Sequence, residues 1–250
     1  MRPIVTLLSD FGTTDSYVAE MKAAIVAFVR DAMLVDVTHE VPPQDVERAR
    51  LLLERYWQRF PPGTVHLVVV DPGVGTTRKA LAVECGHARL VGPDNGVLSP
   101  ALSHREARAV ELVPSAQASA TFHGRDVLAP AAAALALGTP LAQLGRPVAS
   151  PRLVTTPVPR PGPDGAMDGV VLTFDRFGNA VTNLTAGDHP GDRTVEVASR
   201  VVPLLRTYAD VAPGEALALV GSSGLVEIAV REGHAAHRLG LERGMPVRLR

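Results

Sequence analysis

Apolar and polar positions alternate along the first 150 residues with two different periods. Residues 4–8, 34–37 and 65–70 are short apolar runs typical of strands, whereas residues 17–30 and 46–60 carry apolar side chains at helical spacing. Two further strands and a helix are expected at residues 80–84, 89–91 and 127–137. Because strands alternate with helices, the sequence predicts a layered α/β domain with a mainly parallel central sheet.

A proline-rich stretch separates this half from the rest of the chain. Its prolines predict a stiff, extended connector over residues 151–167. The segments beyond it are short and β-like, at residues 169–174, 194–197, 216–220, 225–230 and 247–249. The expected organisation is therefore an N-terminal domain of residues 1–150, the connector, and a small all-β domain of residues 168–250.

Composition narrows the class of protein. The chain has 250 residues, of which 46% are hydrophobic, so it can build a substantial core. A net charge of −1 offers no basic field, and no nucleic-acid partner is expected. The only cysteine, Cys85, excludes an internal disulfide framework and a zinc-cysteine cluster, and a buried free thiol is expected. No stretch resembles a signal peptide or a membrane span, so we expect a cytoplasmic protein with no membrane partner.

The most informative segment is the loop after the apolar run at residues 65–70, Asp71-Pro-Gly-Val-Gly-Thr-Thr-Arg78. Ligands of open α/β sheets bind at the carboxyl ends of strands, where this acid and this base emerge together. Gly73 and Gly75 resemble a nucleotide-binding glycine pair, but Arg78 holds the place of the third glycine. A phosphate-binding loop is therefore rejected, and a ligand site around Asp71 is predicted.

Asp10 and Asp15 flank a second loop, which follows the first strand. Asp10 stands at the carboxyl end of that strand, where a carboxylate commonly accepts the two hydroxyls of a ribose. Asp15 lies just before the first helix, and either an N-cap or a ligand contact fits its position. The sequence therefore predicts that Asp10 contacts a ligand and leaves Asp15 open.

Two more motifs in the N-terminal half carry candidate chemistry. Gly92-Pro-Asp-Asn-Gly96, taken alone, is more typical of a turn or a hairpin than of a site. In Phe122-His-Gly-Arg-Asp126, Asp126 fits a helix N-cap and Arg125 a structural ion pair, whereas the ring of His123 can stand clear of the backbone. The combination of residue types favours a functional role for this segment.

The C-terminal half offers two polar turns. Asp175 and Asn179 open the first, where they could hold a ligand amine and carboxylate or form a turn stabilised by Asx hydrogen bonds. The second, Gly221-Ser-Ser-Gly224, offers hydroxyls and backbone amides, and Glu227 beyond it could be merely solvated. The sequence lacks an HExxH motif and a Gly-x-Ser-x-Gly elbow, so metal catalysis and acyl-enzyme chemistry are disfavoured, and no metal site is expected.

Together these motifs resemble, in their order, the S-adenosylmethionine hydroxide adenosyltransferases, hydrolytic relatives of the fluorinase and chlorinase enzymes. The matching segments are Ser9–Asp15, Val70–Thr76, Gly92–Gly96, Phe122–Asp126, Asp175–Asn179, Tyr208–Val211 and Ser222–Gly224. The resemblance implies a larger α/β domain followed by a small C-terminal β-barrel. It also implies a homotrimer with its sites at subunit interfaces. The implied reaction is cleavage of S-adenosyl-L-methionine at C5′ by water, giving adenosine and L-methionine without a cofactor.

The resemblance also implies roles for individual residues. Asp71, Arg78 and His123 fall on the positions around the attacking water, a set that the halogenating branch lacks. The expected substrate-binding residues are Asp10 and Asp15 near the ribose, Asp175 and Asn179 near the methionine end, and Asn95, Phe122, Ser222 and Glu227. The chain departs from the halogenases at two positions, where Gln44 replaces an aromatic residue and Ser223 replaces an arginine.

These residues suit the implied reaction. A sulfonium leaves as a neutral thioether and needs no acid, so the difficult half is the nucleophile. Arg78 would favour hydroxide character and is expected to lower the pKa of Asp71, which makes His123 the more plausible pH-dependent member. Either Asp71 or His123 could accept the proton. The alternatives are a sensor of S-adenosylmethionine or adenosine with little turnover, a halogenase, and an enzyme that cleaves the glycosidic bond.

Overall fold

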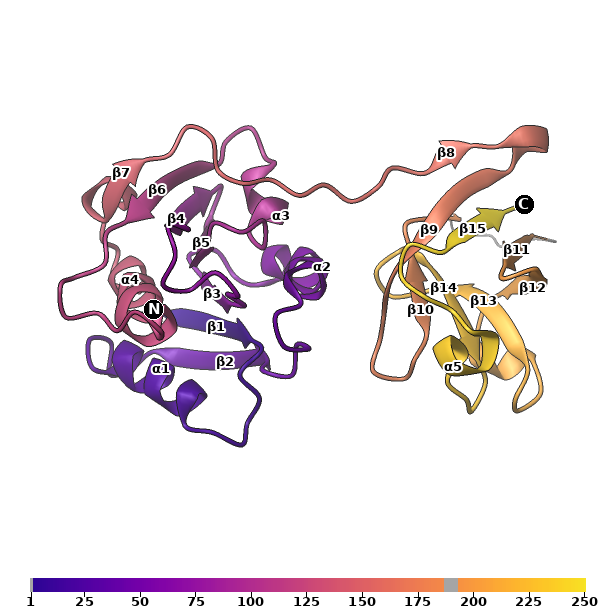
Figure 1. Cartoon of the computed structure of the whole chain (residues 1–250), viewed down its shortest axis with the longest axis horizontal. Coiled ribbons are helices and arrows are strands. Elements are labelled where there is room, and N and C mark those ends of the chain that lie inside the picture. Colours follow the sequence, from indigo (N-terminus) through magenta and orange to yellow (C-terminus); the bar gives the residue numbers. More distant parts are fainter. Residues whose placement is uncertain (1, 187–192) are drawn as a thin grey trace. The chain divides into compact units, whose positions relative to one another are not determined.

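The computed structural model describes residues 2–186 and 193–250. They form two compact units, Met1–Thr155 and Thr156–Arg250, each with its own sheet and core (Figure 1). The division falls inside the proline-rich stretch. Among the described residues, no helix combines the length and the apolar character that a bilayer crossing requires.

The first unit is a layered α/β domain, as the sequence predicted. Its sheet has the strand order β2-β1-β3-β5-β4-β6-β7, in which β2, β1, β3 and β5 pair in parallel, whereas β4, β6 and β7 join the sheet through antiparallel pairings. Its elements are β1 (Ile4–Ser9), α1 (Tyr17–Val26), β2 (Met33–Thr38), α2 (Val46–Tyr56), η1 (Trp57–Arg59), β3 (Val65–Val69), β4 (Ala80–Cys85), β5 (Ala88–Pro93), α3 (Ser99–Leu102), β6 (Arg108–Leu112), η2 (Gly124–Leu128), α4 (Ala129–Ala136), η3 (Leu141–Gln143) and β7 (Gly145–Pro147).

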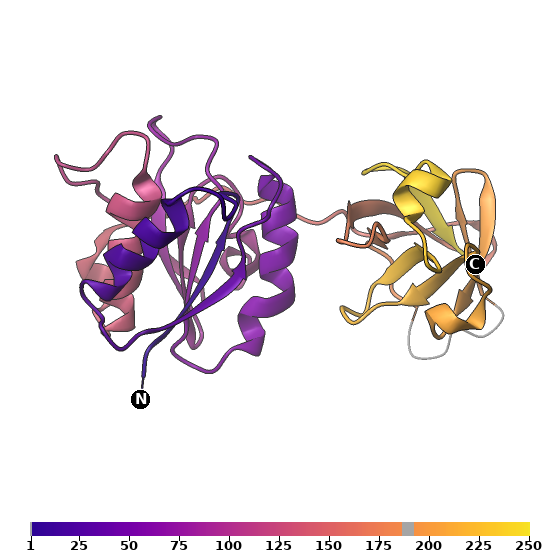
Figure 2. The same cartoon turned by 90° about the horizontal axis from the view of Figure 1, so that it is seen from below.

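Two apolar cores cover the two faces of this sheet. Side chains of β3 alternate between the two cores, with Val65, Leu67 and Val69 in one core and Val68 in the other. Val70, the residue after the strand, belongs to the same core as Val68. Helices α1 and α4 close the first face, and α2 and α3 close the second (Figure 2). A strand buried on both faces reads as a continuous apolar run, which is why the sequence identified β3 so clearly.

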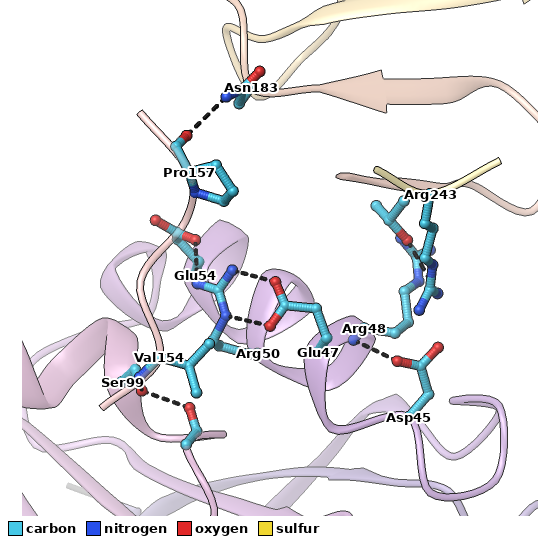
Figure 3. Close-up of polar contacts among 12 residues, drawn as sticks. Asp45, Glu47, Arg48, Arg50, Glu54, Ser99, Val154, Pro157, Asn183 and Arg243 are labelled. Carbon is cyan, nitrogen blue, oxygen red and sulfur yellow. Dashed lines mark hydrogen bonds and ion pairs between the residues drawn. The ribbon is translucent and has the colours of Figure 1, made fainter. Parts of the chain in front are cut away.

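Helix α2 is fixed by polar contacts at its start and along one side. The side chain of Asp45 caps it by accepting from the backbone amide of Arg48 at 2.9 Å. Arg50 is only 2% exposed and donates to both oxygens of Glu47 and to Glu54 (Figure 3). A buried guanidinium requires such partners because an unpaired charge in an apolar setting is costly.

The second unit is a small β-barrel. Its elements are β8 (Arg160–Pro161), η4 (Pro163–Gly165), β9 (Met167–Phe174), β10 (Ala180–Thr182), β11 (Thr194–Val197), β12 (Arg200–Leu205), η5 (Tyr208–Asp210), β13 (Ala216–Val220), β14 (Val226–Val230), α5 (Ala235–Leu239) and β15 (Pro246–Leu249). The order β10-β14-β13-β12-β11-β15-β9 closes through pairing of β9 with β10, and β8 adds to the outer edge of β9. Apolar side chains from all seven barrel strands fill the interior.

Several elements differ from the sequence prediction. Helix α1 ends at Val26 instead of residue 30, and the helix expected at residues 127–137 begins as a π-turn, η2, before α4. Strands β6, β7, β10 and β12 and the short helices α3 and α5 were not predicted. These elements are short, and β12 contains a proline, so periodicity was a weak signal for them. The hairpin considered at Asn95–Gly96 is wrong, because α3 follows the turn instead of a strand.

Candidate active site

A cavity of about 340 Å³ opens at the carboxyl ends of β1 and β3 in the first unit. It brings together four of the residues predicted from the sequence, Asp10, Asp71, Phe122 and His123. The complete lining is Asp10, Phe11, Pro43, Gln44, Val69, Asp71, Pro72, Val74, Thr121, Phe122, His123 and Gly124. Its position agrees with the rule that ligands of α/β sheets bind beyond the carboxyl ends of the strands.

Arg78 contacts both Asp71 and His123. The Nη2 of Arg78 donates to Oδ2 of Asp71 and lies 3.3 Å from Nδ1 of His123. The side chains of Asp71 and Arg78 are each 7% exposed. Asp71 and His123 line the cavity, while Arg78 does not and lies against both. The structure therefore brings together the three residues that the family resemblance placed around the attacking water.

Three polar atoms of this ion pair have no hydrogen-bond partner among the described residues. Oδ1 of Asp71 and both Nε and Nη1 of Arg78 are buried and have no hydrogen-bond partner among the described residues. Buried polar groups are nearly always paired in native proteins, so unpaired atoms beside a cavity indicate a bound group that completes them. The pair is thus suited to hold a small polar molecule such as water.

Burial raises the pKa of Asp71, and the charge and hydrogen bond of Arg78 offset that effect only in part. The neighbouring arginine alone predicts a lowered pKa for Asp71, and this prediction is wrong. A carboxylate whose proton affinity is raised by burial is a stronger base.

Asn95 positions the loop that carries Asp71. Its side-chain amide donates to the carbonyl of Val70 at 2.8 Å and accepts from the amide of Val97 at 3.1 Å. Gly75 has φ of 78°, and a Cβ there would lie 2.7 Å from the carbonyl oxygen of Ala120. Only glycine permits both the conformation and this close approach, which brings the segment before His123 against the Asp71 loop.

His123 precedes the π-turn η2, a distortion that often occurs at functional sites. Arg125 in that turn donates to Glu20 of α1 at 2.8 Å and to Asp126 at 2.6 Å. The structural ion pair expected for Arg125 is therefore confirmed. Because α1 and η2 are tied together in this way, the backbone that carries His123 is held at the rim of the cavity.

Aromatic rings form one wall of the site. The rings of Phe11, Tyr17 and Phe122 contact one another with centroids 5.3–5.7 Å apart, mostly edge to face. The guanidinium of Arg125 lies over Phe122 at 5.0 Å. Phe11 and Phe122 therefore offer apolar surface next to the polar groups of the cavity.

Asp10 contacts a strained backbone. Its Oδ2 accepts from the amide of Gln44 at 2.7 Å, and Gln44 has φ of 66°, which is rare for a residue other than glycine. Such strain tends to occur at functional sites. Asp15 does not line the cavity and does not cap α1, because the N-cap of that helix is Ser16.

A chain of polar contacts, buried at Ser9 and His39 and exposed at Asp36, lies beside the loop that carries Asp10. Oγ of Ser9 lies 2.7 Å from Nδ1 of His39, and Nε2 of His39 lies 3.1 Å from Asp36, which also pairs with Lys22. The amide of Gly12 donates to the carbonyl of His39 at 2.8 Å. This chain ties the loop after β1 to β2, and the sequence analysis did not identify His39.

A second polar cluster lies in the barrel unit. Oδ1 of Asp175 accepts from the amides of Phe177 and Asn179, and its Oδ2 accepts from the side chain of Asn179 at 2.9 Å. The Asn179 amide also lies 3.4 Å from the hydroxyl of Tyr208. The turn is therefore stabilised by Asx hydrogen bonds, which was one of the two roles that the sequence allowed for Asp175 and Asn179.

Glu227 belongs to the same neighbourhood. It is 6% exposed, and its carboxylate packs against Gly221, so the interpretation of a merely solvated side chain is wrong. Burial, followed by the charges of Glu227 and Asp175, raises the pKa of Tyr208. The hydroxyl of Ser223, which follows Ser222, is buried without a hydrogen-bond partner in the described part of the chain. Asp175, Asn179, Tyr208 and Glu227 thus form one polar cluster in the barrel unit.

An α/β domain with a charged cavity at the ends of its central strands, followed by a small β-barrel, defines the class of two-domain α/β proteins to which this chain belongs. The SAM hydroxide adenosyltransferase N-terminal domain matches residues 5–145, and the C-terminal domain of the same family matches residues 169–248. The chain belongs to the SAM hydroxide adenosyltransferase family, and the resemblance inferred from its motifs is confirmed.

Similar proteins agree with this assignment. An (R)-S-adenosyl-L-methionine hydrolase of Thermus thermophilus is 46% identical, and the match covers 100% of both chains. A fluorinase of Actinopolyspora mzabensis is 31% identical over 99% of this chain and 97% of its own. The crystal structure of an uncharacterized conserved protein from Thermotoga maritima superposes with a TM-score of 0.89 at 34% identity, covering 98% and 99% of the two chains.

Proposed function

We propose that this protein hydrolyses S-adenosyl-L-methionine at ribose C5′ and releases adenosine and L-methionine. The observation that carries the proposal is the buried pair of Asp71 and Arg78 beside His123, with polar atoms left over next to the cavity. The higher identity to a named hydrolase than to a fluorinase supports water over halide as the nucleophile. No cofactor is needed, because the sulfonium is itself an activated leaving group.

Asp71 is the group that accepts the proton from the attacking water in this mechanism. A guanidinium only donates, so the contact between Arg78 and His123 makes Nδ1 of the imidazole the acceptor and leaves the ring proton on Nε2. His123 in this tautomer can donate a hydrogen bond from Nε2 but cannot take a proton there. Oδ1 of Asp71 is without a partner among the described residues, and burial raises its basicity.

The remaining groups bind and orient the substrate. In this mechanism Asp10, at the end of β1, accepts the ribose hydroxyls, and the rings of Phe11 and Phe122 offer apolar surface to the adenosine part. As the water, C5′ and sulfur must be aligned, much of the acceleration comes from positioning in a partly dry cavity. The neutral thioether leaves without protonation, so one base and a fixed positive charge suffice.

We also propose a homotrimer in which the barrel cluster of one subunit completes the site of another. Asp175 and Asn179 offer acceptors and donors suited to the amine and carboxylate of methionine, and Phe177 beside them is 74% exposed. Light scattering should then give about three times the chain mass of 26.4 kDa. A monomer at micromolar concentration would contradict this proposal.

The test is chromatography of S-adenosyl-L-methionine after incubation with the pure protein, with chloride present and with chloride absent. We expect adenosine and methionine in equal amounts under both conditions. Substrate that is bound but intact would indicate a sensor. A halogenated nucleoside would indicate a halogenase, and free adenine would indicate cleavage of the glycosidic bond.

A further inference from the structure

Three potential metal ligands converge at the edge of the first sheet that lies away from Asp71. Cys85 ends β4, and His104 and Glu106 belong to the turn after α3. One ligand atom of each lies within 4.8 Å of those of the other two. All three side chains line one cavity of about 420 Å³.

The three groups are held from different sides. Cys85 is 3% exposed and fixed by the pairing of β4 with β5, whereas His104 and Glu106 are exposed. The ring of His104 packs edge-on against Trp57 at 5.4 Å, and the backbone of the turn is closed by a bond from Ala107 to His104. Only the two exposed side chains would need to turn in order to close around an ion.

Each group has bonding capacity left for a ligand. The thiol of Cys85 is free, and Glu106 makes no ion pair with any lysine or arginine in the described ranges. A divalent cation would neutralise both the thiolate of Cys85 and the carboxylate of Glu106.

We propose that Cys85, His104 and Glu106 bind one divalent transition metal ion of the zinc type. Thiolate, imidazole and carboxylate are the ligands that zinc prefers, and in tetrahedral sites such atoms lie about 3.5 Å apart. The present spacing therefore requires a contraction of about 1 Å. The thiol proton passes to solvent when the metal binds. The fourth position stays open to the cavity.

The proposed site is separate from the hydrolytic one. Cys85 pairs with Ala88, and β5 runs parallel to β3, so the cluster lies near the start of β3 while Asp71 follows its end. Five strand residues separate the two edges by about 17 Å. The ion would thus clamp the β4–β5 turn to the turn after α3 and take no part in the cleavage of the sulfonium.

Cobalt(II) tests this proposal directly, because a bond between cobalt and a thiolate gives a charge-transfer band in the near ultraviolet. Cys85 is the only cysteine, so the band has one source in this chain. Protein stripped with a chelator should bind one equivalent of cobalt(II) with this band, and added zinc(II) should remove it. The C85S variant should lose the band completely.

Variants on the exposed turn keep the test independent of folding. H104Q and E106Q should weaken cobalt(II) binding by about ten-fold or more, whereas H87Q, in the same cavity but outside the converging group, should bind as the wild type does. Zinc(II) should also raise the thermal midpoint of the wild type but not that of E106Q. Absence of the band in the wild type, its persistence in C85S, or equal losses in H87Q and H104Q would each overturn the proposal.

Discussion

Asp71 uses one carboxylate oxygen for Arg78 and keeps the other without a hydrogen-bond partner among the described residues. The first contact holds the carboxylate in place, and the second oxygen is available for a water molecule. Removal of the charge with little change in shape should therefore affect turnover more than binding. This relationship between the two side chains leads to the first two predictions.

In Asp71→Asn, we expect kcat to fall by about 10²–10⁴-fold, because the base is lost, while KM changes only a few-fold. Arg78→Ala should bind substrate and lose turnover in the same way. The matched control is Asp164→Asn, an exposed acid in the connector, which should leave both constants unchanged. The measurement is adenosine release against substrate concentration, with substrate binding followed by calorimetry. Near-wild-type turnover of both variants would falsify the assignment of these residues.

The activity should also depend on pH through Asp71. Because burial raises its pKa, the carboxylate is protonated at a higher pH than an ordinary aspartate, and kcat/KM should fall there as the pH is lowered. The His123→Gln variant should have lower activity but keep this acid limb. An acid limb that disappears in His123→Gln would instead assign it to the histidine.

A substitution at Gly75 tests whether the close approach between the Asp71 loop and the segment before His123 matters. Gly75→Ala places a Cβ 2.7 Å from Ala120 at φ of 78°, whereas Gly63→Ala meets the same conformational cost at φ of 85° in open space. The control variant should lose about 1–2 kcal/mol of stability, and Gly75→Ala should lose more and also lower kcat. Urea unfolding and turnover of the two variants measure this difference. Equal stability losses with unchanged turnover would contradict the role of the close approach.

The sequence predicted the site residues that lie at the carboxyl ends of strands. Asp10 and Asp71 each follow an apolar run, and parallel strands bring such ends to one edge. The contact between Arg78 and His123 joins residues 45 positions apart, and only the resemblance to a family suggested it beforehand. The left-handed conformation of Gln44 had no signal at all, because glycine or asparagine is the usual residue there.

The depth at which individual side chains are buried could not be predicted from the sequence. Residue types alone suggested a lowered pKa for Asp71 and a possibly solvated Glu227, and both suggestions were reversed by how deeply these side chains lie. Strand β6 was missed for a related reason. Its alternation is short and begins at an exposed arginine, so only its pairing with β4 and β7 defines it.

A variant of Asn95 can distinguish two roles for this residue, namely positioning the Asp71 loop and contacting the substrate. The family resemblance placed Asn95 among the binding residues, but its side-chain amide is hydrogen-bonded to the backbone of Val70 and Val97. Asn95→Asp keeps the acceptor for Val97 and removes the donor to Val70, so we expect a lower kcat with a nearly unchanged KM and a lower thermal midpoint. A substrate contact would instead raise KM with little change in stability.

The last prediction concerns stability. His66 is fully buried in the first unit, where its Nδ1 lies 2.8 Å from Thr6, and burial lowers the pKa of His66 to about 4. The unfolded chain binds this proton near the ordinary value of 6.5, so stability is fully present above that pH and falls as the pH is lowered toward 4. Between pH 7 and pH 5 the loss should be about 2 kcal/mol. His66→Gln keeps a hydrogen-bonding group without titrating, and its urea unfolding should lack this part of the pH dependence, whereas the exposed control His87→Gln should retain it. Identical pH dependence in His66→Gln and the wild type would show that folding does not lower the pKa of His66.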